Sequence, residues 1–244
     1  MRRFTLPPER VIDGRVTFDA DESRHLTRVL RLRPGDTVVA TDGAGRDYTV
    51  RLETLGEAVT GTVLAAAAGP HESPLTVTLV QGVPKGDRME TILRAATELG
   101  VARVLPALCE RTVVRLEPGR WRERARRWQR VAREAAKQCG RAVIPDVETP
   151  RPLDEWLAAA GPADLALCPW EGGGAALATT LAAAGAPRSA LLVVGPEGGL
   201  AAVEVDAARA RGFTVVSLGP RILRTETAGP ALLAILQSRF GDLR

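Results

Sequence analysis

The sequence predicts an α/β protein in which a small β-rich module precedes a larger domain built on a parallel sheet. Short β-branched runs separated by turn signals fill the first 70 residues. After Pro74, apolar runs of strand length alternate with helical segments, the pattern of strands buried on both faces of a parallel sheet. Residues 69–74 are rich in glycine and proline and form the expected linker. The 244 residues allow two domains, which we expect at 1–70 and 74–244.

The N-terminal module is expected to be a small β-barrel or a related β-rich fold. Its β-branched, partly alternating segments predict strands at 16–18, 37–40, 48–52 and 58–63. An Asp-Gly pair at 42–43 is a hairpin signal between two of them. A short helix is expected over 23–30, because Asp21 or Ser23 can cap it and Pro34 stops it.

The second domain is expected to alternate strands with helices throughout. Apolar runs predict strands at 75–83, 101–109, 163–168, 190–194 and 214–218. Helices are expected over 87–99, 119–139, 153–160, 175–184, 201–211 and 227–239. Thr227 is the expected cap of the last helix, with Pro230 tolerated in its first turn. Parallel sheets bind ligands at the carboxyl ends of their strands, so the expected site lies in loops 169–174, 195–200 and 219–226.

Composition excludes several classes of protein. Hydrophobic residues make up 45% and charged residues 25%, as in ordinary globular proteins. No apolar run reaches about 18 residues and no signal peptide is visible, so we expect no membrane partner. Cys109, Cys139 and Cys168 are scattered, and the chain has two histidines, so we expect no disulfide framework, no metal site and a reducing, cytoplasmic location. No dinucleotide-binding or P-loop motif occurs, so a nicotinamide-dependent oxidoreductase and a P-loop NTPase are disfavoured. The GxSxG motif of serine hydrolases is absent as well.

Positive charge is concentrated in one segment. Residues 71–140 carry a net charge of +6, against 0 for 1–70, −4 for 141–200 and +2 for 201–244. Such a concentration is expected where a polyanion contacts one face. Only Lys85 and Lys137 of the 33 basic residues are lysine, which suits bidentate phosphate contacts but fits codon bias equally well.

Two loops at strand ends carry the strongest chemical signal. Residues 195–199 read Gly-Pro-Glu-Gly-Gly, and their glycines allow a ligand or another backbone to approach closely. Residues 218–228 read Leu-Gly-Pro-Arg-Ile-Leu-Arg-Thr-Glu-Thr-Ala. Each loop alone also fits a purely structural interpretation: a tight turn for the first, and a capped helix with solvent-facing arginines for the second.

Together these loops resemble the signature of the SPOUT superfamily, and the chain more closely resembles its RsmE family. That family methylates N3 of a uridine in small-subunit ribosomal RNA. Further segments that carry the resemblance lie at 25–36, 81–90, 96–101, 110–113, 128 and 134–141. Ala95 stands where lysine is more usual, Cys139 replaces a common serine, and Gly229-Pro230 replaces an alanine-rich continuation.

The resemblance implies an N-terminal PUA-like β-barrel and a SPOUT domain with a C-terminal trefoil knot. It implies that S-adenosylmethionine (SAM) binds in the knot, and that the protein is a homodimer acting on 16S ribosomal RNA in the assembled small subunit. The residues expected to bind the cofactor are Pro169, Trp170, Glu171, Gly195, Pro196, Glu197, Gly198, Gly199, Leu218, Gly219, Ile222, Leu223 and Thr227.

Catalysis at uridine N3 requires loss of the imide proton and stabilisation of the resulting negative charge. Arg221 or Arg224 is the expected charge stabiliser. Glu226 and Glu197 are the carboxylates of these loops, so one of them is a candidate base. Glu226 also fits a structural role, as a carboxylate favoured by the dipole at the start of a helix.

The basic helix at 119–139 predicts an RNA contact. Trp121, Ala125, Trp128, Ala132 and Ala135 form one apolar face, which we interpret as core. Its arginines suit phosphate contact, although a solvated face is the alternative. The residues expected to contact RNA are Arg2, Arg28, Arg31, Arg33, Lys85, Arg88, Arg111, Arg120, Arg124, Arg127 and Arg141.

Two other functions stay open at this point. One is a different knotted methyltransferase, acting on a ribose 2′-oxygen or on transfer RNA. The other is a non-catalytic RNA-binding factor for ribosome assembly, against which the two intact loops argue.

Overall fold

The computed structural model describes residues 3–243, which form two compact units. One unit comprises residues up to 72 together with 136–144, and the other comprises 73–135 together with the remainder from 145. The sequence predicted domains at 1–70 and 74–244, so the membership of residues 136–144 in the first unit was not predicted. Within that unit, Thr41 Oγ1 donates to Ala142 O at 2.8 Å, and Ile144 N donates to Gly43 O at 2.9 Å.

The first unit is a curled six-stranded sheet, as predicted for its β-branched segments. Its strands run in the order β1-β4-β5-β6-β3-β2. Their bounds are β1 Arg3–Thr5, β2 Val11–Ile12, β3 Arg15–Thr17, β4 Thr37–Thr41, β5 Arg46–Thr54 and β6 Thr60–Ala68. The hairpin signal at 42–43 is confirmed by the antiparallel pairing of β4 with β5. Phe4, Phe18 and Leu26 are buried at the centre of this unit.

The helix predicted over 23–30 is wrong in its start and in its form. A 3-10 turn, η1, spans Pro8–Arg10, and α1 spans Ala20–Arg24. The chain then continues as a wider π-helical turn, η2, over His25–Val29. Neither expected residue caps α1: Asp19 does, because its carboxylate accepts a hydrogen bond from Glu22 N at 2.8 Å.

The second unit is built on a parallel sheet, as predicted. Its strands run β10-β8-β7-β13-β11-β14-β12, with β9 also paired to β8, and every pairing is parallel. The bounds are β7 Thr76–Gly82, β8 Val101–Leu108, β9 Asp146–Val147, β10 Arg151–Pro152, β11 Leu165–Pro169, β12 Ala175–Ala176, β13 Ser189–Val194 and β14 Thr214–Ser217.

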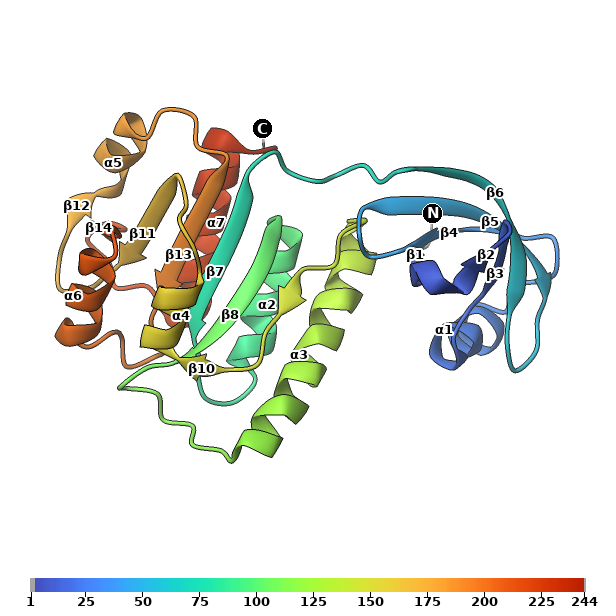
Figure 1. Cartoon of the computed structure of the whole chain (residues 1–244), viewed down its shortest axis with the longest axis horizontal. Coiled ribbons are helices and arrows are strands. Elements are labelled where there is room, and N and C mark those ends of the chain that lie inside the picture. The colour runs from blue at the N-terminus through green and yellow to red at the C-terminus, as the bar shows by residue number, and fades with distance from the viewer. Residues whose placement is uncertain (1–2, 244) are drawn as a thin grey trace. The chain divides into compact units, whose positions relative to one another are not determined.

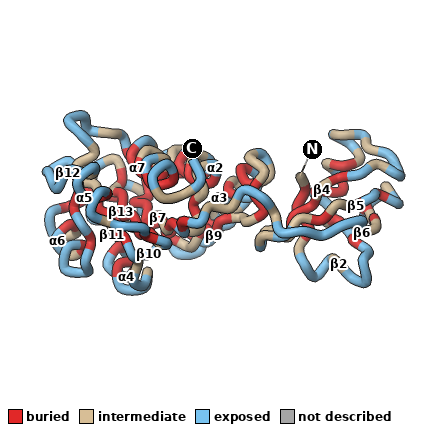
Figure 2. The backbone as a smooth tube through the Cα atoms, turned by 90° about the horizontal axis from the view of Figure 1, so that it is seen from above, coloured by how far each residue is buried: buried red, intermediate tan, exposed pale blue. Residues whose placement is uncertain are grey.

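Helices cover both faces of this sheet (Figure 1). They are α2 Arg88–Glu98, α3 Pro118–Cys139, α4 Leu153–Ala159, α5 Leu177–Ala183, α6 Ala202–Ala210 and α7 Thr225–Phe240. Side chains of α2, α3, α5 and α7 share one core with Leu192, whereas α4 and α6 share the other with Leu191 and Val193. The strands are therefore buried on both sides, and Figure 2 shows the central strands largely in the colour of buried residues.

The apolar face predicted on α3 is confirmed as core. Trp121 and Trp128 are 5% and 3% exposed, and their ring centroids lie 6.4 Å apart. Both rings pack in the core that α3 shares with the sheet. They are therefore not available as platforms for stacked bases.

The last helix begins two residues earlier than predicted, at Thr225, so Thr227 is not its cap. Arg224 occupies the cap position and makes no side-chain capping bond. Pro230 consequently lies in the second turn, where its missing N–H leaves the Glu226 carbonyl without its usual helical donor. The helix expected over 175–184 likewise begins at Leu177, after the two residues of β12 pair with β14.

Candidate active site

A pocket of about 600 Å³ lies where β11, β13 and β14 end in the second unit. The three loops predicted from the strand ends meet there. All of the expected cofactor residues except Thr227 line it, together with Arg221, Arg224 and Glu226. The pocket is also lined by Leu200, Pro220 and Thr225, which lie in the predicted loops but were not named as cofactor residues, and by Val194, Ser217 and Ala228, which lie outside those loops. Arg88, expected to contact RNA, lines the pocket as well. Thr227 is exposed outside the pocket.

The loop at 195–199 is held by contacts from three other segments. From α7, the Thr225 hydroxyl donates to Gly195 O at 2.7 Å. From the connection between β7 and α2, Lys85 N donates to both carboxylate oxygens of Glu197, at 3.3 and 3.4 Å. From the loop after β8, Arg111 Nη1 donates to Gly198 O at 3.0 Å. The shape of this wall is therefore fixed by the surrounding fold.

Gly199 has to be glycine in this loop. Its φ is +72°, in the left-handed region that side chains other than glycine rarely adopt. A Cβ at this position would also overlap the Glu171 carboxyl group, whose Cδ would lie 3.0 Å away. The left-handed backbone is the main reason for a glycine here, because the flexible Glu171 side chain could turn away from an added Cβ.

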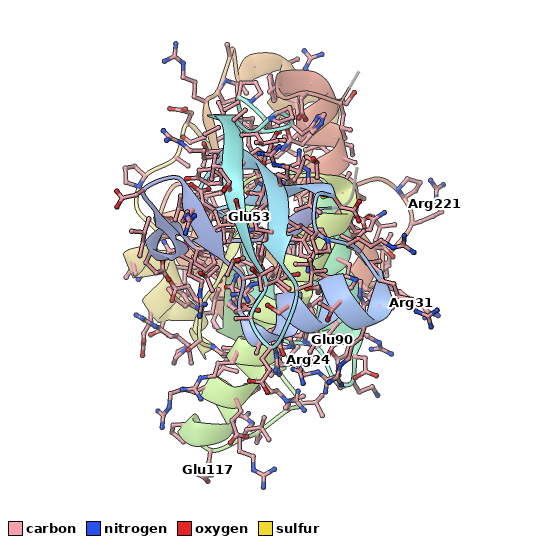
Figure 3. The ribbon with its side chains drawn as sticks, turned by 90° about the vertical axis from the view of Figure 1, so that its right-hand side faces the viewer. Arg24, Arg31, Glu53, Glu90, Glu117 and Arg221 are labelled. Atoms are coloured by element: carbon pink, nitrogen blue, oxygen red, sulfur yellow. The ribbon has the colours of Figure 1, made fainter. Side chains whose placement is uncertain are left out.

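Three charged side chains gather at the start of α7. Glu226 Oε1 lies 3.9 Å from both Arg88 Nε and Arg224 Nη1, and the Glu226 side chain is 21% exposed. Arg224 is 82% exposed, and Figure 3 shows Arg221 pointing outward from its loop. Two guanidinium groups thus flank one carboxylate at the edge of the pocket. Neither is at hydrogen-bonding distance of it.

Trp170 forms a further part of the wall. Its indole Nε1 donates to Leu200 O at 3.4 Å, and the Arg209 guanidinium lies 5.9 Å from the ring centroid. A Cβ at Gly172 would lie 2.5–2.7 Å from the outer ring atoms, so the glycine leaves the indole its space. The pocket therefore combines apolar side chains with backbone polar groups, the usual composition of a small-molecule site.

Comparison with known proteins identifies the family. The RNA methyltransferase domain family matches residues 71–237, and the RNA methyltransferase PUA domain family matches residues 18–60. Ribosomal RNA small subunit methyltransferase E of Synechocystis is 38% identical over 234 residues, 95% of this chain and 76% of that protein. The chain belongs to the ribosomal RNA small subunit methyltransferase E (RsmE) family.

Solved structures agree with this assignment over the full length of the RsmE chain. An RsmE from Neisseria gonorrhoeae bound to SAM is 34% identical, with a TM-score of 0.90 and complete coverage of both chains. A second SAM-bound structure, from Legionella pneumophila, is 29% identical, with a TM-score of 0.91 over 100% of this chain and 99% of that one. SAM is therefore the cofactor of this family member, and the PUA-like N-terminal unit and SPOUT domain implied by the resemblance are confirmed.

The basic residues expected to contact RNA are not equivalent in this RsmE. Most of them are exposed to solvent: Arg28, Arg31, Arg33, Lys85, Arg111 and Arg120. Arg124 is half-buried. Arg124 lies over the ring of Trp121, with its Cζ 5.9 Å from the ring centroid, and Arg127 pairs with Glu90 at 2.7 Å. Arg88 lines the pocket. Arg2 lies outside the described residues.

Arg141 does not fit the RNA role expected of it. It is 4% exposed, and its Nη2 lies 2.9 Å from Glu72 Oε2 within the first unit. Glu72 also accepts a hydrogen bond from Val143 N at 3.0 Å. The guanidinium thus serves the packing of 136–144 onto the curled sheet, and a phosphate could not reach it without breaking that pair.

Two cysteines are buried near the site without lining it. Burial raises the pKa of the Cys168 thiol to about 12 and that of the Cys109 thiol further still. Both thiols are therefore neutral and unreactive at physiological pH. Over residues 3–243 no group of three or more histidine, cysteine or acidic residues could hold a metal ion, and no helix is long and apolar enough to span a membrane.

Proposed function

We propose that this RsmE methylates N3 of a uridine in 16S ribosomal RNA, with the assembled small subunit as its substrate. SAM-dependent methylation of ribosomal RNA follows from membership of the family. The base, the atom and the state of the RNA are the proposal. The observation that carries it is the pocket, where the two RsmE-like loops converge beside a carboxylate and two arginines.

The pocket suits SAM in size and in composition. Its volume of about 600 Å³ lies within the usual range for sites that bind small molecules. Leu218 and Leu223 offer an apolar slot, and the backbone of 195–199 offers polar groups at close approach. SAM supplies an electrophilic methyl group, so the protein has to bind it, orient the uridine and manage one proton.

The proton on N3 has to leave for a base before or during transfer of the methyl group. Glu226 is better placed for this than Glu197, because both oxygens of Glu197 accept hydrogen bonds from Lys85 N. Arg88 and Arg224 flank Glu226 and are available to stabilise charge that spreads onto the two carbonyl oxygens of the uracil ring. The exposed Arg221 serves the same role or contacts the RNA backbone.

The decisive experiment uses labelled SAM with small subunits that lack the modification, free 16S RNA and transfer RNA. We expect 3-methyluridine in the subunit sample alone, identified by mass spectrometry of the digested nucleosides. A ribose-methylated product or a transfer RNA product would overturn the proposed base and substrate. SAM binding without transfer to any RNA would favour a non-catalytic assembly factor.

The catalytic residues are tested with Arg224→Ala and Glu226→Gln. We expect both variants to bind SAM as the native protein does while turnover falls about 10²-fold or more, because the lost groups act on the uridine. Arg211→Ala, an exposed arginine at the end of α6, is the matched control and should leave turnover unchanged. Full turnover in Arg224→Ala would remove that arginine from the mechanism.

We also infer that the protein acts as a homodimer in the cytoplasm, where small subunits are assembled. A second, largely apolar groove of about 690 Å³ is lined by α5 and α7, including Leu177, Leu181 and Ile235. It shares residues 217–219 with the proposed cofactor pocket, so a second copy seated there would adjoin the site. Ile235→Glu should therefore produce a monomer in sedimentation. A monomeric native protein would refute the dimer.

A further inference from the structure

Gln81 lies outside the pocket but bonds to two of its walls. It is fully buried near the carboxyl end of β7, and the parallel register pairs it with Val194, the last residue of β13. Its Nε2 donates to Thr225 Oγ1 at 2.9 Å and lies 3.4 Å from Gly195 O. The register of β7 with β13 thus places the Gln81 amide where the loop after β13 contacts the start of α7.

The order of donors in this contact is fixed by its chemistry. Thr225 donates its hydroxyl proton to Gly195 O at 2.7 Å, so its oxygen is left to accept from Gln81 Nε2. The same Nε2 lies 3.1 Å from Gly82 O. Reversing the amide would set its oxygen against the carbonyl oxygens of Gly82 and Gly195, which is repulsive. Gln81 therefore acts as the donor.

The other end of the amide has no partner. Gln81 Oε1 is buried and accepts no hydrogen bond, an arrangement that costs free energy in a folded protein. A Cβ at Gly229 would lie 3.3 Å from this oxygen, so α7 passes directly over the amide. A glycine at 229 makes that approach possible. Thus a glutamine stays buried here with half of its hydrogen-bonding capacity unused.

We propose that Gln81 is a positioning residue for the methyl donor. It holds Thr225 and the Gly195 carbonyl together, so the wall from β13 and the wall from α7 are set before SAM binds. The two walls are the loop after β13 and the start of α7, and no strand pairing holds these two segments together. The inference rests on the placement of SAM in this pocket proposed above.

Gln237 provides a matched control within the same unit. It is also fully buried, and its Oε1 accepts from Ser73 Oγ at 2.6 Å while its Nε2 lies 3.4 Å from Gly100 O. It does not line the pocket. Replacing either glutamine by methionine removes one buried amide at similar volume. A general loss of stability is therefore common to both variants.

The test compares Gln81→Met with Gln237→Met by calorimetry and by steady-state kinetics on the ribosomal substrate. We expect Gln81→Met to raise the Kd and KM for SAM about tenfold, the loss of one buried hydrogen bond, while the KM for RNA stays unchanged. Gln237→Met should lower the melting temperature without changing SAM affinity. In a Thr225→Val background Gln81→Met should have a much smaller effect, because the two act through one chain of bonds.

Two further variants keep the outcome decisive. If Gln81→Met does not fold, Gln81→Asn keeps a polar amide but is too short to reach Thr225, and it should weaken SAM binding in the same way. Ala228→Leu narrows the pocket directly. Two outcomes overturn the role of Gln81. In the first, Ala228→Leu abolishes SAM binding but the Gln81 variants bind SAM normally. In the second, Gln237→Met weakens SAM binding as much as Gln81→Met does. Normal binding in all four variants refutes instead the placement of SAM in this pocket.

Discussion

Gly82→Ala is expected to displace the Gly195–Pro196 segment, which forms one wall of the cofactor pocket, because Gly82 lies against this segment. Gly82 is the last residue of β7, and a Cβ there would lie 2.5 Å from Pro196 Cδ and 2.8 Å from Gly195 C. Ordinary contacts begin near 3.4 Å, so the Gly195–Pro196 segment would have to move by about 1 Å. These atoms belong to the backbone and a proline ring, and neither can rotate away.

The displacement has two measurable consequences. Overpacking of this kind costs about 1–3 kcal/mol of stability, which lowers the melting temperature by roughly 2–12 °C for a chain of this size. A shift of about 1 Å in a group that orients a reactant can also reduce activity about 10²-fold. We therefore expect SAM affinity and kcat/KM to fall further than the stability loss alone would require at 25 °C.

Differential scanning calorimetry, SAM titration and labelled methyl transfer measure these quantities separately. The control is Gly119→Ala in the first turn of α3, where the nearest atom to the added Cβ is 4.0 Å away. That change should be neutral or stabilise by up to about 1 kcal/mol, because alanine favours helix. If Gly82→Ala binds SAM normally and melts at the same temperature as the native protein, the close approach at Gly82 does not fix the position of the Gly195–Pro196 wall.

Three other predictions concern charge and burial. Arg141→Ala should destabilise the protein by about 3 kcal/mol in urea melts, because it leaves Glu72 partly buried without its partner; a change below about 1 kcal/mol would contradict the structural role. Arg120→Ala should leave stability unchanged but reduce the slope of log affinity for RNA against log salt by about 0.7–0.9, and an unchanged slope would place Arg120 off the RNA. Stability should fall as pH rises above about 9, because Cys109 and Cys168 ionise in the unfolded chain but stay protonated when folded. Urea melts between pH 8 and 10 measure this loss, and Cys168→Ala should lessen it.

The longer strands could be predicted from sequence because a strand that is buried on both faces is a continuous run of apolar residues. The runs that became β7, β8, β13 and β14 were recognised in this way. The short strands could not be. The two residues of β12 are strand only because they pair with β14, and Arg151–Pro152 only because they pair with β8. Such pairings arise from the tertiary fold and leave no periodicity in a segment of two residues.

The start of α7 shows where a local rule fails for a physical reason. A threonine is a good helix cap, so the sequence favoured Thr227. In the structure the Thr225 hydroxyl, at the first residue of α7, donates to Gly195 O in the loop after β13 instead of capping its own helix. The three loops of the site were predicted because strand ends can be read from sequence. The role that we propose for Gln81 was not, since it depends on the register between β7 and β13.

The loop at 195–199 links the two binding tasks expected of this enzyme. Its carbonyl and carboxylate groups are held by Thr225 at the start of α7, by Lys85 after β7 and by Arg111 after β8. Lys85 and Arg111 are also exposed cations in the segment that carries the excess positive charge. Because Arg111 reaches Gly198 through its guanidinium, a phosphate that engaged this group would compete with the bond that shapes the cofactor wall. If RNA binds at Arg111, as we propose, RNA and SAM therefore share this contact, and the affinity for one should respond to the presence of the other.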